Sequence, residues 1–225
     1  MIARPGAIST KHRSVLIFMN KDKQVLGKYF PEKAVDLVFT QLQSKKVQLR
    51  ISRKRHTKLG DFRHEHNGKP HRISINHNLS PYSFLIVFVH ELAHLYVYEQ
   101  YGNRVMPHGK EWKMAFRQLM QPYFSLNIFP PDIEHALLQY LQNARAANGT
   151  DLNLTRVLNN YDHADLGTVE VEALADNTVF SMPDGRVFKK LSRVRKRYKC
   201  ICMQTQKIYL FNPLTQVMPV TTDAS

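Results

Sequence analysis

The sequence predicts an α+β protein with a larger mixed domain followed by a small β module. Up to residue 147 the chain alternates between helical patterns, with apolar residues spaced three and four apart, and strand patterns of period two. In the middle of this region, Ser80 to Gly102 is apolar in nearly every direction around a helix. Beyond residue 177 only short strands and turns recur. Together these three observations place a domain boundary between the two regions.

The first elements precede the apolar helix. Residues 1–27 are polar and weakly patterned, so we treat them as an N-terminal extension without an assigned role. A helix is predicted over Phe30 to Gln43, opened by Pro31 and carrying one apolar stripe. Residues 47–52 then alternate between apolar and polar, which predicts a half-buried strand.

A hairpin is predicted next, with strands at Leu59 to Arg63 and Arg72 to Asn76 around the turn residues Asn67 and Gly68. The result is a small antiparallel sheet ahead of the apolar helix. If Arg72 to Asn76 lies at the sheet edge, its free amides and carbonyls could hold an extended peptide. We assign no catalytic or metal role to the histidines of this hairpin, which are His64, His66 and His71.

The apolar helix itself has marked ends. Ser80 can cap its first amides, and Gly102 suits the residue that closes a helix. Its interior contains three polar side chains, His90, Glu91 and His94. Burying such groups without partners costs about 2 kcal/mol or more each, so a bound metal ion is the simplest compensation.

The spacing of these three residues supports a catalytic metal. His90 and His94 are one helical turn apart and can grip a single ion from one face. Glu91 is rotated by roughly 100° and is placed beside a water on that ion. This is the HExxH pattern, in which zinc lowers the pKa of its water and the glutamate takes the proton.

A third protein ligand must come from the residues after Gly102. His108 follows a short loop and precedes an amphipathic helix beginning near Gly109, which can return it to the metal. Spacing leaves three competitors, which are Glu111, Glu134 and His135. With three protein ligands, water would take the fourth position of an open site.

The formal net charge of +14 is unevenly distributed. Residues 1–148 hold 22 Lys and Arg against 10 Asp and Glu, and residues 45–72 alone hold ten against two. Such density favours polyanions such as nucleic acid, although a solvated basic face is the alternative. We expect the contacts in this region from Arg53, Lys54, Arg55 and Lys58.

The chain shows no signal for a membrane or for secretion. No apolar run approaches the ~18 residues that span a bilayer, and the apolar patch at residues 15–19 is too short for a secretory signal. A cytoplasmic location is expected, and association with the nucleoid would fit the basic charge. Residues alone do not indicate an oligomeric state.

Further along the chain, residues 130–147 predict one more helix, and residues 149–176 a polar linker with one short helix near Leu154 to Leu158. The module at residues 177–225 is predicted to be all-β. Residues 186–199 contain eight Lys and Arg and no acid, a combination that can track phosphates. The residues expected to do so are Arg193, Arg195, Lys196 and Arg197.

The stretches HELAHLYVYEQYG and PHGKEWKMAF resemble the SprT-like zinc metallopeptidases, the group that includes the Spartan DNA-protein crosslink proteases. The resemblance spans residues 30–125. It implies a zincin-like metallopeptidase domain at 28–148, in which His90, His94 and His108 bind zinc and Glu91 is the general base. It also implies cleavage of proteins associated with or crosslinked to DNA, and thus a role in DNA-protein crosslink repair.

The C-terminal module departs from that family. YKCIC, with Cys200 and Cys202, resembles the first half of the zinc ribbon of bacterial SprT proteins, but a second cysteine pair is absent. We therefore predict a zinc-ribbon-like β module held by hydrophobic packing, and one zinc per chain. Two rival functions stay open: a nucleic-acid-binding protein with a structural or weakly active zinc site, and a metal-dependent hydrolase acting on something other than protein.

Overall fold

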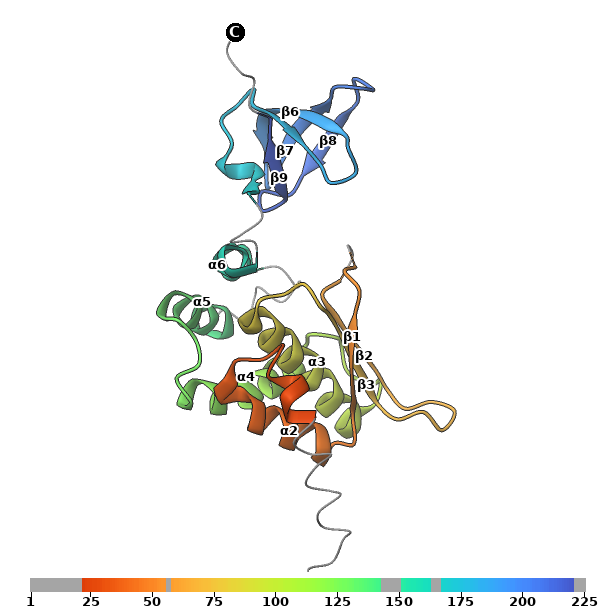
Figure 1. Ribbon diagram of the computed structural model, residues 1–225. Helices are drawn as coiled ribbons and strands as arrows, with labels where there is room; N and C mark the ends of the chain where they lie inside the picture. The colour runs from red at the N-terminus through yellow and green to blue at the C-terminus, as the bar shows by residue number, and fades with distance from the viewer. Residues whose placement is uncertain (1–21, 56–57, 143–150, 163–166, 221–225) are drawn as a thin grey trace, which may run out of the picture. The chain divides into compact units, whose positions relative to one another are not determined.

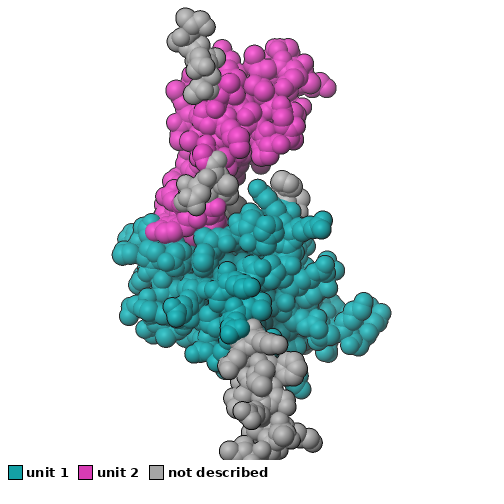
Figure 2. Space-filling view, in the orientation of Figure 1, with its two compact units in different colours: residues 1–151 teal, residues 152–225 magenta. Residues whose placement is uncertain are grey.

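The computed structural model describes residues 22–55, 58–142, 151–162 and 167–220. The chain divides between residues 151 and 152 into two compact units, coloured separately in Figure 2. Within the described residues, no helix has the length and apolarity needed to cross a membrane.

Unit 1 begins earlier than the sequence predicts. Of the predicted extension at residues 1–27, the first 21 residues lie outside the described part of the chain. Residues 22–26 form a helical turn in which Leu26 is buried, and the Lys23 ammonium lies 2.6 Å from the Asp36 carboxylate. Residues 22–27 therefore belong to the folded domain, because Leu26 contributes to its core.

The helices of unit 1 agree with the predicted positions. They are η1 (Glu32–Ala34), α2 (Val35–Ser44), α3 (Pro81–Tyr101), α4 (Lys110–Ser125) and α5 (Pro131–Gln142). Ser80 caps α3 as expected, since its hydroxyl oxygen accepts a hydrogen bond from the Ser83 amide at 3.3 Å, and Gly102 ends the helix with a φ of 59°.

Helix α3 forms the centre of unit 1. It packs against two strands of the small sheet, β2 (Gly60–Arg63) and β3 (Arg72–Asn76), and against α4 (Figure 1). Its side chains Phe84, Leu85 and Phe88 are fully buried, and Phe30 contacts Phe84 edge-on with ring centroids 5.0 Å apart. The predicted enclosure of this helix is confirmed.

The sheet of unit 1 differs from the prediction in two respects. Its strands β1 (Gln48–Ser52), β2 (Gly60–Arg63) and β3 (Arg72–Asn76) lie in the order β1-β3-β2. Strand β1 runs parallel to β3, so the sheet is mixed and not antiparallel throughout. Strand β3 is central and not an edge, because four consecutive residues, 73–76, are buried and both of its backbone edges are paired. The edge strand next to α3 is β2.

The described residues of unit 2 form one α-helix and a six-stranded sheet. The helix is α6 (Leu152–Asp162), and a 3-10 turn, η2 (Val171–Ala173), follows the first strand. The strands are paired antiparallel in the order β4-β9-β5-β6-β7-β8. Their bounds are β4 (Val169–Glu170), β5 (Val179–Ser181), β6 (Val187–Val194), β7 (Arg197–Cys202), β8 (Ile208–Phe211) and β9 (Gln216–Pro219).

The predicted linker at residues 149–176 is therefore corrected, because its expected short helix, α6, and the elements β4 and η2 belong to unit 2, whereas the described residues of the module at 177–225 form only strands, as predicted. Helix α6 is joined to the sheet by an Arg156–Glu172 ion pair at 2.6 Å and by a hydrogen bond from Asn159 to Glu170 at 2.8 Å. The polar residues that suggested a linker are partners for one another across these elements. Their pairing depends on the tertiary fold, so composition alone does not indicate it.

The core of unit 2 includes both cysteines. Cys200 and Cys202 are unpaired thiols, fully buried beside Phe180, Phe188 and Val217. Burial raises the pKa of the Cys200 thiol to about 11, which keeps it protonated at neutral pH. In the described part of unit 2, no His, Cys, Asp and Glu side chains bring three ligand atoms together. The module is held by hydrophobic packing, as the missing cysteine pair predicts.

A buried lysine joins the η2 turn to strand β6. Lys190 is only 3% exposed, and its ammonium donates to the backbone carbonyls of Leu174 and Glu172. It also lies 4.2 Å from the centre of the Tyr198 ring and 3.9 Å from the Asp176 carboxylate. A single cation thus connects the loop, the sheet and an aromatic ring, and these contacts offset the cost of burying its charge.

We expect Lys190→Met to destabilise unit 2 by about 1–3 kcal/mol, because two buried carbonyls would lose their donor. Hydrogen exchange followed by mass spectrometry should show faster exchange in β6 and β7 but not in α3. The matched control is Lys189→Met, whose side chain lies on the opposite face of the same strand. Equal effects of the two substitutions would contradict the proposed connection.

Candidate metal centre

Two of the three histidines in this site come from α3. His90 and His94 lie on one face of the helix and are partly buried, whereas Glu91 between them is 7% exposed. The apolar residues on the other faces fix the helix against the sheet and α4. The rotation of α3, and hence the direction of both imidazoles, is set by this packing.

The third histidine comes from the turn that enters α4. His108 has a φ of 58°, a conformation that few residues other than glycine adopt. The turn is closed by the Gly109 amide, which donates to the Met106 carbonyl at 2.9 Å. A Cβ at position 109 would lie 2.9 Å from that same carbonyl oxygen, so the tight turn requires glycine. This backbone geometry directs the His108 ring back toward α3.

The three Nε2 atoms form a compact triangle. They lie 3.0 Å apart between His90 and His108, 3.1 Å between His94 and His108, and 3.3 Å between His90 and His94. Two nitrogen ligands of a tetrahedral zinc ion are about 3.3 Å apart, given Zn–N bonds of 2.0–2.1 Å. A circle through the three atoms has a radius of about 1.8 Å, which is shorter than a Zn–N bond, so all three nitrogens could contact one ion. The triangle could therefore hold a metal ion with one open position.

Burial keeps these histidines neutral. It lowers the pKa of His90 to about 3 and of His94 to about 4, with the neighbouring imidazoles contributing, and it also lowers the pKa of His108. Neutral imidazoles offer the lone pairs that a metal requires.

Trp112 packs beneath all three imidazoles. Its ring centroid lies 4.6 Å from that of His90, 4.7 Å from His108 and 5.5 Å from His94. The indole N–H donates to the His90 carbonyl at 3.3 Å, and the ring stacks on Phe116 with centroids 5.0 Å apart. Sequence reasoning placed Trp112 only in the core. Its position four residues after His108, on the first turn of α4, was the available signal for this role.

Glu91 lies beneath strand β2. Its carboxylate accepts a hydrogen bond from the Phe62 amide, and a Cβ at Gly60 would come within 2.8 Å of its Oε1 and 2.6 Å of Val87 Cγ1. Only glycine permits this close approach of strand and helix, which sequence reasoning missed. Burial, assisted by the charge of Asp61, raises the pKa of Glu91 to about 7.

A network of charges supports Asp61 on β2. The Arg55 guanidinium pairs with Asp61 and also donates to Asn76 Oδ1 at 2.8 Å and to the Ser74 carbonyl at 3.2 Å. Lys58 lies 3.4 Å from the same carboxylate. These contacts hold the pKa of Asp61 below its usual value despite its burial. Arg55, predicted as a contact for nucleic acid, is thus engaged within the protein, whereas Lys58 pairs with Asp61 and stays exposed.

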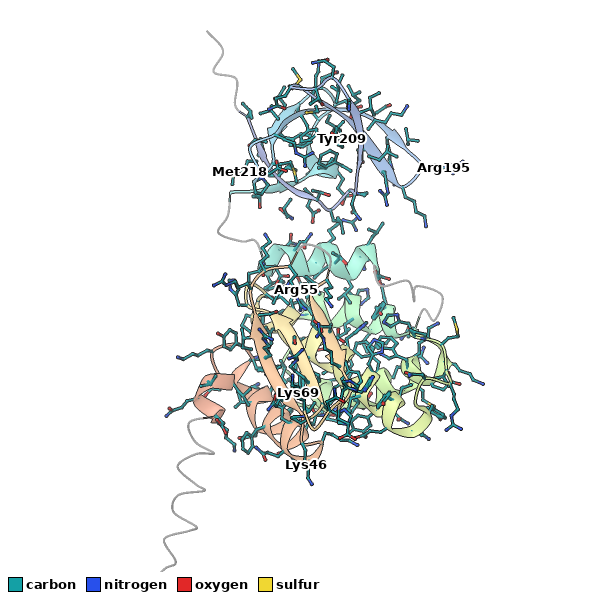
Figure 3. All side chains as sticks on the ribbon, turned by 90° about the vertical axis from the view of Figure 1, so that its right-hand side faces the viewer. Lys46, Arg55, Lys69, Arg195, Tyr209 and Met218 are labelled. Carbon is teal, nitrogen blue, oxygen red and sulfur yellow. The ribbon has the colours of Figure 1, made fainter. Side chains whose placement is uncertain are left out.

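The other residues predicted to contact nucleic acid are exposed. Arg53 and Lys54 follow β1 in unit 1. In unit 2, Figure 3 labels Arg195, which lies in the turn between β6 and β7 with a φ of 53°. The exposed cations of this turn, which we name the basic turn, are Arg193, Arg195, Lys196 and Arg197.

A cleft of about 630 Å³ lies over the three histidines. Its lining includes β2 residues 60–62, the α3–α4 loop at 102–108, and the side chains of Glu91 and Trp112. The histidine triangle and the buried carboxylate therefore both face a space large enough for a segment of a substrate.

The competing ligands lie elsewhere. Glu111 is 3.7 Å from the ammonium of Lys110, and His135 contacts Gln139 on α5 at 2.8 Å. Within the described residues, the histidine triangle is the one group of three ligand atoms close enough for a metal. His71 accepts a hydrogen bond from the Glu65 amide at 2.9 Å, and His64 stacks on Tyr98.

Comparison with known proteins locates a similarity in unit 1. The family model described as the SprT-like family matches residues 28–135. Over 34 residues the chain is 59% identical to the protein named Protein SprT of Glaesserella parasuis, covering 15% of this chain and 21% of that protein. Over 35 residues it is 57% identical to Protein SprT of Yersinia pestis, covering 16% and 20%. The chain thus spans about a fifth of the length of these relatives, and no solved structure matches it.

We expect the protein to bind one divalent ion, and His108→Ala to weaken this binding by about 100-fold or more, because one of three ligands is lost. The matched control, His135→Ala, should keep wild-type affinity. Competition with a chromophoric chelator gives the affinities, and elemental analysis gives the stoichiometry. Retention of full affinity in His108→Ala would exclude this residue as a ligand.

Proposed function

Residues 28–135 of this chain are a SprT-like domain, and from this premise we propose that the protein is a zinc-dependent peptidase of zincin-like architecture that acts on DNA-associated or DNA-crosslinked proteins. The observation that carries the proposal is the convergence of three histidine Nε2 atoms beside a buried glutamate in one cleft. Neither a structural metal nor a simple binding module needs an open cleft with a carboxylate beside the ligands.

His90, His94 and His108 are the proposed ligands, and their neutral imidazoles and separations fit zinc. A zinc ion held there would polarise the peptide carbonyl and make a bound water more acidic. Glu91 takes a proton from the attacking water as the water oxygen bonds to the carbonyl carbon. It then delivers that proton to the amine nitrogen as the C–N bond breaks. A carboxyl group whose pKa is raised by burial is suited to both transfers.

The peptide is proposed to lie along β2. The Leu59 carbonyl accepts from the Asn76 amide at 2.9 Å, and antiparallel ladders alternate, so Asp61 and Arg63 direct their backbone groups toward β3. Gly60 and Phe62 then direct theirs to the free edge, where the Phe62 amide already serves Glu91. The amide and carbonyl of Gly60 and the carbonyl of Phe62 could pair with an added strand. We therefore assign the binding of an extended peptide to β2. The sequence predicted it for the strand at residues 72–76, but that strand, β3, has no free edge.

The DNA part of the proposal is supported by charge. Residues 45–72 carry ten basic residues, and those of the basic turn are exposed without an acidic neighbour in residues 186–199. Cations that contact phosphates release counterions, which favours binding of any DNA sequence. The proposed place of action is the cytoplasm, including the nucleoid.

Glu91→Gln is expected to abolish cleavage of a DNA-binding protein substrate while retaining zinc, because the amide cannot accept a proton. Cleavage is measured with single-stranded DNA, with duplex DNA and without DNA, and zinc by elemental analysis. Glu111→Gln, on the neighbouring turn, is the matched control and should cleave normally. Absence of cleavage by the wild-type protein under all three conditions would favour the alternative of a DNA-binding protein with a structural zinc.

DNA affinity is expected to fall steeply with added salt, and a triple substitution of the basic turn should reduce the slope of log K against log[salt] by up to about 3. The substitutions are Arg193→Gln, Arg195→Asn and Lys196→Gln, with asparagine chosen because it tolerates the positive φ at position 195.

The control removes the same charge elsewhere, by changing Lys28, Lys110 and Lys207, all exposed, to Gln. Fluorescence anisotropy with a labelled oligonucleotide gives the slopes. If both triple variants change the slope equally, the basic turn has no specific role and only net charge matters.

A further inference from the structure

We propose that one end of the cleft is a side-chain pocket that accepts an aromatic or large aliphatic residue of the substrate on the acyl side of the scissile bond. This inference rests on the proposed peptidase function and adds a specificity to it. We name this end the distal pocket, and its lining residues are His64, Val97, Tyr98, Val105 and Met106.

The floor of the distal pocket continues the row of metal-site histidines. Tyr98 follows His90 and His94 at a spacing of four, so the three side chains lie along one face of α3. Four residues advance a helix by about 6 Å, which places Tyr98 one turn beyond the last ligand on that helix. The pocket is therefore adjacent to the metal centre and is part of the same cleft.

The Tyr98 ring is held in place by the β2–β3 hairpin. It stacks on His64 with ring centroids 4.7 Å apart and an interplanar angle of 10°. Phe62 and His71 lie behind it, with ring centroids at 6.0 Å and 6.1 Å. The hydrogen bond from the Glu65 amide to His71 Nδ1 in turn fixes that imidazole. The aromatic wall is thus preformed and loses little freedom when a ligand binds.

The opposite rim comes from the α3–α4 loop and is apolar. Met106 is 76% exposed although its side chain lines the cleft, and Val105 lies beside it. The fold does not cover these side chains, whereas a substrate residue between them and Tyr98 would. A methionine side chain can adapt to aromatic and aliphatic shapes alike.

Charge distinguishes the two ends of the cleft. Asp61 and Glu91 line the end at Gly60, but none of the described residues of the distal pocket is Lys, Arg, Asp or Glu. An acidic or basic substrate side chain would lose hydration there without gaining an ion pair. An uncharged apolar side chain fits this end best.

The direction of the substrate follows from Glu91. This residue returns a proton to the leaving amine and touches β2 at Gly60, so the amine side of the substrate faces Gly60 and the acyl side faces His64. A substrate strand that pairs antiparallel with β2 would have this same orientation, with its acyl side toward His64 and its amine side toward Gly60. Because Tyr98 lies about one helical turn beyond the last ligand, we assign the distal pocket to the residue directly before the scissile bond.

The test uses hydroxamates, which bind zinc without turnover and place their acyl residue where the acyl side of a substrate would lie. Titration calorimetry compares N-acetyl-phenylalanine, N-acetyl-leucine and N-acetyl-glycine hydroxamates on the zinc-loaded full chain. We expect the first two to bind about 10-fold more tightly than the glycine compound, because their side chains are buried in the distal pocket. Tyr98→Ser and His64→Ser should each reduce this advantage to within about 3-fold and leave the affinity of the glycine compound unchanged.

Matched controls are Tyr101→Ser, on the same helix, and His66→Ser, in the same hairpin, neither of which lines the cleft. Both should keep the full advantage. Equal affinity of the three compounds for the wild-type protein, or an advantage that survives in both cleft variants, overturns the distal pocket even if the protein cleaves peptides.

Conversely, if the hydroxamates bind with the expected affinities but no peptide is cleaved, the distal pocket is supported and the proposed peptidase activity is excluded. If no hydroxamate binds the zinc-loaded protein, the metal centre and the pocket are excluded together.

Discussion

The burial of His90, Glu91 and His94 inside an apolar helix is the constraint on which unit 1 depends. Three polar side chains in this setting require partners, and the surrounding elements supply them. The turn at His108 brings a third imidazole, the Phe62 amide serves the carboxylate, and Trp112 closes the site from below. The same packing that stabilises the domain therefore positions the groups proposed to act on the substrate.

Close approach of β2 to α3 is the second requirement of the site. Gly60 allows the strand to touch the helix at Glu91, and Arg55 joins Asp61 on β2 to Asn76 on β3. Because β3 takes the centre of the sheet, β2 is left as the edge beside the cleft. This one strand helps to bury the Glu91 carboxyl group, which raises its pKa, and the charge of Asp61 raises that pKa further. The same strand is the one proposed to offer backbone groups to a peptide.

Unit 2 is stabilised without a cluster of cysteine ligands in its described residues. The two cysteines contribute volume to an aromatic core, and the buried ammonium of Lys190 joins the η2 turn to the sheet through backbone carbonyls. The exposed basic turn of unit 2, in contrast, has no role in this packing.

The sequence by itself determined the local elements and the residues that could hold a metal ion. Helix periodicity and capping residues predicted α3 within one residue at each end, and the HExxH spacing with His108 predicted the three side chains that the structure brings together. These features depend on neighbours within a few turns, so they can be read along the chain. Tertiary structure alone decided which strand is the edge, that residues 152–176 belong to unit 2, and that Arg55 pairs with Asp61. It also decided the stacking of His64 on Tyr98. Each of these features depends on contacts between residues that are distant in sequence. A local sequence pattern does not show which distant residues meet or how strongly they interact.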